Sequence, residues 1–134
     1  MSSLNNLTGV SKIKDADLVF LIKIVNKTHA SIGMTFLVNG VFMTGQLISG
    51  KTYYDAVSER MRESGEAGIA LSNYFTNSAD DVYSPAQDED APTTFLHLKD
   101  VKVKSDSGQL NEIVGAYFRI KVEEVDGHAI GSMS

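Results

Sequence analysis

The chain has 134 residues, of which 43% are hydrophobic, with no cysteine and a formal net charge of −5. This length suits one domain with its own hydrophobic core, and the lack of cysteine excludes disulfides and cysteine-ligated zinc. The longest apolar run, residues 18–25, is interrupted by Lys23 and is far shorter than a membrane span. No signal-peptide pattern precedes it. We therefore expect a cytoplasmic protein with no membrane partner.

The acidic excess is concentrated in one segment, residues 79–92, which has five acidic residues and no basic one: Asp80, Asp81, Asp88, Glu89 and Asp90. Removing these five from the 17 acidic residues leaves as many acids as bases, 12 of each. A neutral body beside an acidic segment is a poor match for a phosphate backbone. The charge pattern therefore argues against nucleic acid as a partner.

The N-terminal part predicts a flexible arm over residues 1–14 followed by a helix over residues 16–28. Asp15 and Asp17 stand where a helix start favours acids. Apolar residues then recur at helical spacing: Leu18, Leu21, Ile22 and Val25. The β-branched residues in this stretch leave a strand as the alternative.

The next segment reads as a β-hairpin. Residues 34–38 and 41–48 are rich in strand formers and flank Asn39-Gly40, a pair that tolerates the positive φ values of a type I′ turn. Gly45 lies inside the second strand and predicts a bend or bulge there. We therefore expect a tight turn at Asn39 and Gly40 and a distortion at Gly45.

Helical spacing returns over residues 52–75, where Tyr53, Val57 and Met61 recur every four residues. Gly65 and Gly68 predict a division into two helices. Residues 77–93 contain proline and many acids without an apolar period, which predicts a mobile acidic loop. Its carboxylates form a possible electrostatic contact surface, with a plain solvated loop as the alternative.

The last third predicts three further strands, at residues 95–103, 116–122 and 128–132, with a turn at Asp126 and Gly127 between the last two. Together the elements indicate an α+β fold in which residues 15–134 form a single domain. We expect a small five-stranded antiparallel sheet or an SH3/Sm-like barrel, with an N-terminal helix and a helical insertion.

Catalytic, cofactor-binding and metal-ligating residues are not apparent. His29, His97 and His128 are far apart and show no metal-ligand spacing. Residues 45–52 match the phosphate-loop pattern G-x-x-x-x-G-K-[ST] between a strand and a helix. The match lacks an acidic strand for Mg²⁺ and parallel βαβ repeats, and its centre is strand-like. We interpret it as a coincidence, and a small nucleotide-binding protein stays as a lesser alternative.

Three ordered blocks resemble the gas vesicle accessory protein of the U type, the GvpU-like family, over about residues 15–132. The blocks are Val38-Asn39-Gly40 with Gly45, Ile48-Ser49, Lys51 and Tyr53; Phe95-Leu96-His97-Leu98-Lys99; and Glu124-Val125-Asp126-Gly127 with Gly131. The resemblance implies a non-enzymatic protein that binds gas vesicle shell proteins, self-associates and clusters vesicles in the cytoplasm.

A weaker similarity to Sm-like RNA-binding proteins surrounds residues 36–41 and supports the barrel alternative. The Tyr-Lys-His segment with which bacterial Sm-like proteins contact RNA is not found in this sequence. An Sm-like RNA-binding oligomer is therefore the second hypothesis, after the gas vesicle accessory protein. The terminal strand, residues 128–132, has no lysine or proline to block pairing, so we expect a homo-oligomer.

Overall fold

The computed structural model describes residues 14–83 and 91–133. The first helix, α1 (Ala16–Thr28), begins at Asp15, whose carboxylate accepts hydrogen bonds from the backbone N–H groups of Asp17 (2.9 Å) and Leu18 (3.0 Å). It ends at His29, which adopts the left-handed conformation with φ 60°. The helix predicted over residues 16–28 is confirmed. The predicted arm lies outside the described residues except for Lys14.

Within this described part of the chain, six strands form one antiparallel sheet: β1 (Ile32–Val38), β2 (Val41–Ile48), β3 (Phe95–Lys104), β4 (Leu110–Glu112), β5 (Tyr117–Lys121) and β6 (Val125–Ile130). Their order is β4-β3-β2-β1-β6, and β5 pairs with the other half of β3. In the described residues β6 does not pair with β4 or β5, so the sheet is open rather than a closed barrel. The α+β prediction is confirmed, with one strand more than the five expected.

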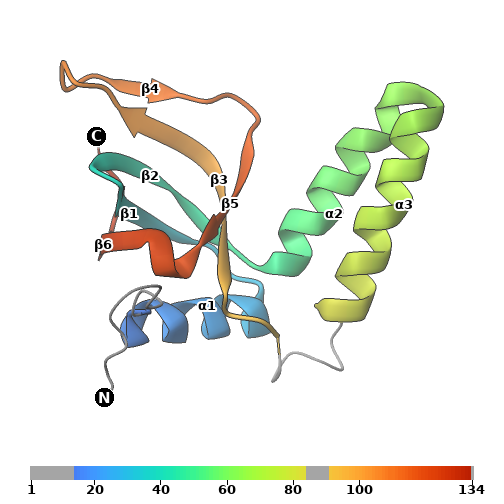
Figure 1. Ribbon diagram of the computed structural model, residues 1–134, viewed down its shortest axis with the longest axis horizontal. Coiled ribbons are helices and arrows are strands. Elements are labelled where there is room, and N and C mark those ends of the chain that lie inside the picture. The colour runs from blue at the N-terminus through green and yellow to red at the C-terminus, as the bar shows by residue number, and fades with distance from the viewer. Residues whose placement is uncertain (1–13, 84–90, 134) are drawn as a thin grey trace, which may run out of the picture.

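The hydrophobic core lies between α1 and one face of the sheet (Figure 1). Strand alternation directs every second side chain of the sheet to that face. Its buried members come from α1, from the three strands β1, β2 and β3, and from the short helix η3 (Val122–Glu124): Leu18, Ile22, Val25, Met34, Phe36, Leu47, Leu96, Leu98, Val101 and Val122. None of them belongs to the helical insertion.

The hairpin between β1 and β2 turns at Asn39 (φ 50°) and Gly40 (φ 80°), the positive values that a type I′ turn requires. The pairing of β2 with β3 shifts register between Thr44 and Gln46, around Gly45. A Cβ at Gly45 would lie 3.0 Å from the backbone oxygen of Lys99, so the bulge brings two strands unusually close.

Asp126 and Gly127 do not form the predicted turn, because both lie inside β6. The β1–β6 pairing shifts register between Leu37 and Val38, which leaves Asp126 as an extra residue in β6. Its carboxylate accepts a hydrogen bond of 2.9 Å from the backbone N–H of Asn39. The Asp-Gly pair therefore marks a bulge that stabilises the neighbouring β1–β2 turn.

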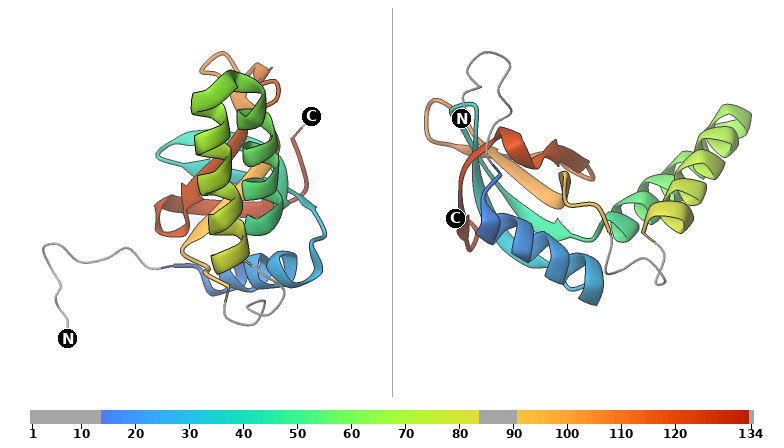
Figure 2. Two further views of the ribbon diagram at one scale, coloured as in Figure 1. Left: turned by 90° about the vertical axis from the view of Figure 1, so that its right-hand side faces the viewer. Right: turned by 60° about the horizontal axis from the view of Figure 1, so that its bottom comes forward.

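The insertion is a helical hairpin of α2 (Gly50–Met61), a single turn η1 (Arg62–Ser64) and α3 (Gly65–Val82). Figures 1 and 2 show the two helices side by side, projecting away from the sheet and from α1. The division predicted near Gly65 occurs there. The loop predicted from residue 77 is wrong at its start, because α3 continues to Val82 and includes Asp80 and Asp81. The other acids, Asp88, Glu89 and Asp90, lie outside the described residues.

Candidate interaction surfaces

The interface between α2 and α3 is made of small and polar side chains. The Ser58 hydroxyl lies 2.8 Å from the Ser72 hydroxyl and 2.6 Å from that of Thr76, and also donates to the Ser72 carbonyl at 2.9 Å. Gly68 packs so closely on the carbonyl of Met61 that a side chain there would overlap it. Small residues let the two helices approach closely, and their hydroxyls satisfy one another inside the contact.

Several larger apolar side chains of α3 are exposed, whereas Phe75 packs against Tyr54 of α2 with ring centroids 5.8 Å apart. Leu71 is 50% exposed, Tyr74 65% and Val82 37%. These residues are three and eight positions apart, so they lie along one side of the helix, and we call them the α3 stripe. An amphipathic helix normally buries such a stripe against its own domain. Here the stripe faces outward from a projecting hairpin, which marks it as a candidate contact surface.

The hairpin joins the sheet through a cluster of aromatic rings, which we call the aromatic joint: Tyr53, Tyr54, Tyr83 and His97. The His97 ring, on β3, lies 4.6 Å from Tyr53, 6.0 Å from Tyr54 and 5.9 Å from Tyr83 between ring centroids. Gly50 allows this packing, because a Cβ there would overlap the Tyr83 ring. The joint therefore sets the direction in which the α3 stripe projects.

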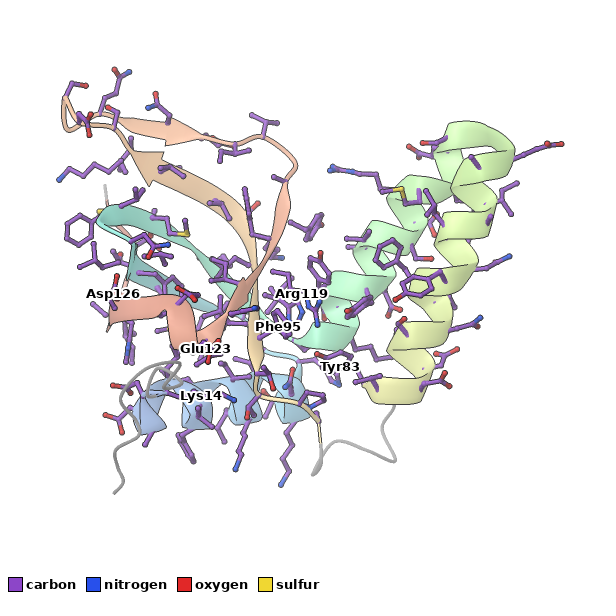
Figure 3. All side chains as sticks on the ribbon, viewed as in Figure 1. Lys14, Tyr83, Phe95, Arg119, Glu123 and Asp126 are labelled. Carbon is purple, nitrogen blue, oxygen red and sulfur yellow. The ribbon has the colours of Figure 1, made fainter. Side chains whose placement is uncertain are left out.

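Arg119 lies next to this joint, on the β5 strand that pairs with β3. Its guanidinium lies 3.5 Å from the ring centroid of Phe95, a cation–π contact (Figure 3). Figure 3 also shows Tyr83 at the base of the hairpin, facing the sheet. A second arginine, Arg60 of α2, reaches across to the backbone carbonyl of Gly115 and over the ring of Tyr117. Both arginines thus lie where the hairpin meets the sheet.

Burial controls the ionisation of the joint. It lowers the pKa of His97 to about 3, and the positive charge of Arg119 adds to the shift. Burial also raises the pKa of Tyr53 and of Tyr83, Tyr54 adds to the rise, and Arg119 opposes it. Tyr53, Tyr83 and His97 are therefore uncharged near pH 7. His97 Nε2 is buried and has no hydrogen-bond partner among residues 14–83 and 91–133.

The geometry gives little support for catalysis or metal binding at these positions. An imidazole with a pKa of about 3 is poorly matched to proton transfer near pH 7. His29 contacts the Ser49 hydroxyl at 3.1 Å, and His128 lies 4.0 Å from Asp15, so the three histidines occupy separate places. Within residues 14–83 and 91–133, no group of three histidines or carboxylates could hold a metal ion.

The phosphate-loop pattern at residues 45–52 does not form a phosphate loop. Residues 46–48 pair with β3, and residues 46 and 47 also pair with β1, so their backbone is used by the sheet. Ser49 caps α2, because its hydroxyl accepts from the Thr52 N–H at 3.0 Å. The Gly50 N–H is also engaged, donating to Asn26 at 3.0 Å. A phosphate would find these groups occupied.

A second group of exposed apolar side chains surrounds the free edge of β6. Phe20 on α1 is 60% exposed and Ile130 on β6 70%. A shallow groove on the α1 side of β6 is lined by these two residues with Leu21. Another, on the other side of the strand, is lined by Leu37 and Phe42. We call this region, with Ala129 between the two grooves, the β6 edge.

These features define a small α+β protein with exposed apolar side chains at two separated surfaces, the α3 stripe and the β6 edge. The family model for the gas vesicle protein GvpU-like family matches residues 15–133. The chain therefore belongs to the GvpU-like family and is a gas vesicle-related protein. Neither the curated proteins nor the solved structures contain a match to it. Among the described residues, no helix is long and apolar enough to cross a membrane.

Sequence reasoning missed both apolar surfaces and the aromatic joint. One signal for the joint was available: in residues 95–99 His97 alternates with Leu96 and Leu98, so it faces away from the core. The adjacent tyrosines Tyr53 and Tyr54 cannot share one narrow helix face, which indicates that a wide surface covers α2. The predicted contact residues Asp80 and Asp81 are exposed on α3, near Val82 of the stripe.

Proposed function

We propose that this protein is a non-enzymatic accessory protein that binds gas vesicle shell proteins, self-associates and thereby clusters vesicles in the cytoplasm. The observation that carries the proposal is the family match over residues 15–133. Its members are gas vesicle proteins, and the match covers both the sheet and the helical hairpin.

The placement of the two apolar surfaces supports clustering. The α3 stripe lies on the hairpin, which contacts the sheet at β3, whereas the β6 edge is separated from β3 by β2 and β1. A protein must engage two bodies at once to link them, and it can do so only through surfaces that do not compete. One surface can therefore hold the vesicle while the other meets a second copy.

We assign the vesicle contact to the α3 stripe, which in this proposal binds the shell proteins. The stripe residues Leu71, Tyr74 and Val82 do not belong to the core, so the fold does not require them to be apolar. The hairpin that carries them projects away from the sheet (Figure 2), so that a broad surface such as a vesicle wall can reach it. Asp80 and Asp81 lie beside the stripe and add a salt-sensitive contribution.

Co-flotation with purified gas vesicles tests this proposal, because buoyancy separates bound from free protein. We expect the wild type to float with vesicles, and the double variant Leu71→Lys with Tyr74→Lys to bind at least tenfold more weakly. Placing two charges in an apolar contact costs more than about 1.4 kcal/mol, the equivalent of tenfold. Val114→Lys is the matched control, because Val114 is 84% exposed on the β4–β5 connection, away from both surfaces.

Flotation of the double variant as strong as that of the wild type would contradict the assignment to the stripe. Absence of wild-type flotation at every salt concentration, together with tight binding of single-stranded RNA, would instead favour the Sm-like alternative. A phosphate-binding protein gains affinity steeply as salt falls. Neutralising Asp80 and Asp81 to asparagine should change the salt dependence of flotation while leaving binding at high salt in place.

A further inference from the structure

We propose that the β6 edge pairs in antiparallel fashion with the β6 edge of a second copy of this chain, around a two-fold axis at Ala129. Two sheets would then continue into one another. The inference rests on the self-association in the proposed function and names the surface and register through which it occurs.

The first argument is the direction of the backbone groups in β6. The Gly131 N–H donates to the Gly33 carbonyl at 2.7 Å, which makes this a hydrogen-bonded pair of the antiparallel ladder. Such pairs recur at every second residue, so Ala129 directs its backbone groups toward β1. The N–H and C=O groups of His128 and Ile130 therefore point outward. Among the described residues no strand pairs with them.

The second argument is the apolar surface on both sides of this edge. An added strand places alternate side chains on opposite faces of the sheet. On the face toward α1 these side chains would meet Phe20 and Ile130. On the other face they would meet Leu37 and Phe42. A helix could cover the apolar side chains but could not satisfy the outward backbone groups, so the occupant must be a strand.

The third argument is that β6 lacks free charges. Two identical edges can pair only if they do not bring like charges together. Two copies related by a two-fold axis bring like side chains close together, and like charges there would repel. Asp126, the one carboxylate of β6, is bonded to the Asn39 N–H, and His128 is directed toward Asp15. Exposed charges mark the opposite edge of the sheet, where β4 and β5 present Glu112, Arg119 and Lys121. Charged edges resist such pairing, and β6 has no such protection.

The register follows from the outward groups. An axis at Ala129 pairs His128 of each copy with Ile130 of the other, so that both outward residues exchange N–H···O bonds in two equivalent pairs. An axis at His128 would pair Ile130 with Asp126, the bulge residue, and an axis at Ile130 would pair His128 with Ser132, beyond the strand. The Ala129 axis alone uses every outward group that lies in regular strand.

Because the chain has no cysteine, a single introduced cysteine tests this register without ambiguity. In the proposed pair the two copies of residue 129 form a non-hydrogen-bonded pair with Cα atoms about 4.5 Å apart, within the range that a disulfide spans. We expect Ala129→Cys to form a covalent dimer nearly completely under mild oxidation. Val114→Cys, at another exposed position, should give only the small yield of random collision.

A second variant tests the hydrogen bonds. Ile130→Pro removes an outward N–H and leaves the internal β1–β6 bonds in place, so the fold should persist while dimerisation weakens at least tenfold in light scattering. Ile130→Val retains the N–H and should dimerise like the wild type. A wild type that stays monomeric at millimolar concentration would overturn the inference, as would equal cross-linking of Ala129→Cys and Val114→Cys.

Flotation separates this outcome from failure of the proposed function. If the wild type floats with vesicles but Ala129→Cys does not cross-link, the vesicle contact stands and the β6 pairing is refuted. Wild-type protein that does not float, with Ala129→Cys cross-linking in full, retains the pairing and refutes the function. Ile130→Pro should still float, and should lose only the clustering of vesicles seen by microscopy.

Discussion

The sheet and the helical hairpin are built in opposite ways. The sheet and α1 bury their large apolar side chains in a shared core, with Phe36 and Leu98 fully inaccessible. The hairpin buries glycine, serine and alanine between its helices and leaves Leu71 and Tyr74 outside. Apolar burial is the main source of folding stability, so the sheet supplies the stability of the domain. In the hairpin, Leu71 and Tyr74 stay exposed and form part of the contact surface that we propose.

This difference gives the aromatic joint its importance. The hairpin shares no residue with the main core and meets the sheet mainly through α2 and Tyr83. Regions with few apolar contacts to the rest of a domain open locally at lower free energy than the core does. The joint at His97 therefore determines how firmly the proposed contact surface on α3 is held.

The largest expected effect belongs to the sheet. Phe36→Ala should lower the free energy of unfolding by about 3–5 kcal/mol, because it removes a buried ring and leaves a cavity. Leu71→Ala, on the α3 stripe, should change it by no more than about 0.5 kcal/mol. Urea titration followed by circular dichroism measures both. A similar loss in the two variants would show that α3 contributes to stability as the core does, and would remove the contrast between the regions.

Local rules in the sequence predicted most of the fold. The cap at Asp15 and the apolar spacing of residues 18–25 located α1, and Asn39-Gly40 located the tight turn. Each signal depends on neighbours within a few residues, and the tertiary structure agrees with it. Strand β4 (Leu110–Glu112) gave no signal because the strand is short and its residues are mostly polar. It forms because it pairs with β3, and a pattern within a few residues does not reveal such a pairing.

Tertiary contacts decided the points where sequence reasoning was wrong. Asp126-Gly127 has the composition of a turn, but it forms a bulge in β6. The Asp126 carboxylate there accepts a hydrogen bond from the backbone N–H of Asn39, 87 residues away in the sequence. Asp80 and Asp81 have the composition of a loop, but the buried Ala79 holds that part of the chain in α3. The candidate surfaces escaped prediction because periodicity identifies an apolar side of a helix and not whether that side is covered.

The next largest effect is a loss of folding stability at acid pH, caused by the buried His97 of the aromatic joint. His97 has a pKa of about 3 in the folded protein and about 6.5 when unfolded, so the unfolded chain takes up the proton first as pH falls. Its contribution to stability is therefore lost between pH 6.5 and pH 3, by about 1.4 kcal/mol per pH unit. At pH 4.5 the wild type should have lost close to 3 kcal/mol through this group.

His97→Phe is the matched variant, because an aromatic ring fits the tyrosines around it and cannot titrate. Urea titrations of both proteins at pH 7 and pH 4.5 measure the difference, while the other titratable groups act equally in each. The variant should be the less sensitive of the two to acid. Equal acid sensitivity of the two proteins would mean that His97 is not buried by the hairpin.

The smallest expected effect separates the two regions directly. In Gly50→Ala the added methyl group overlaps the ring of Tyr83, so the ring must leave its place at the end of α3. Overpacking of this kind costs about 1–3 kcal/mol. Hydrogen exchange should show that cost as faster exchange in α2 and α3, while β1 and β2 remain protected, since the core does not include the joint.

Gly127→Ala is the control, because its methyl group would lie at an ordinary distance of 3.9 Å from Leu37 Cβ. Uniform acceleration across sheet and hairpin in Gly50→Ala would show that the two unfold as one unit. The α3 stripe would then be held by the stability of the whole domain rather than by the aromatic joint.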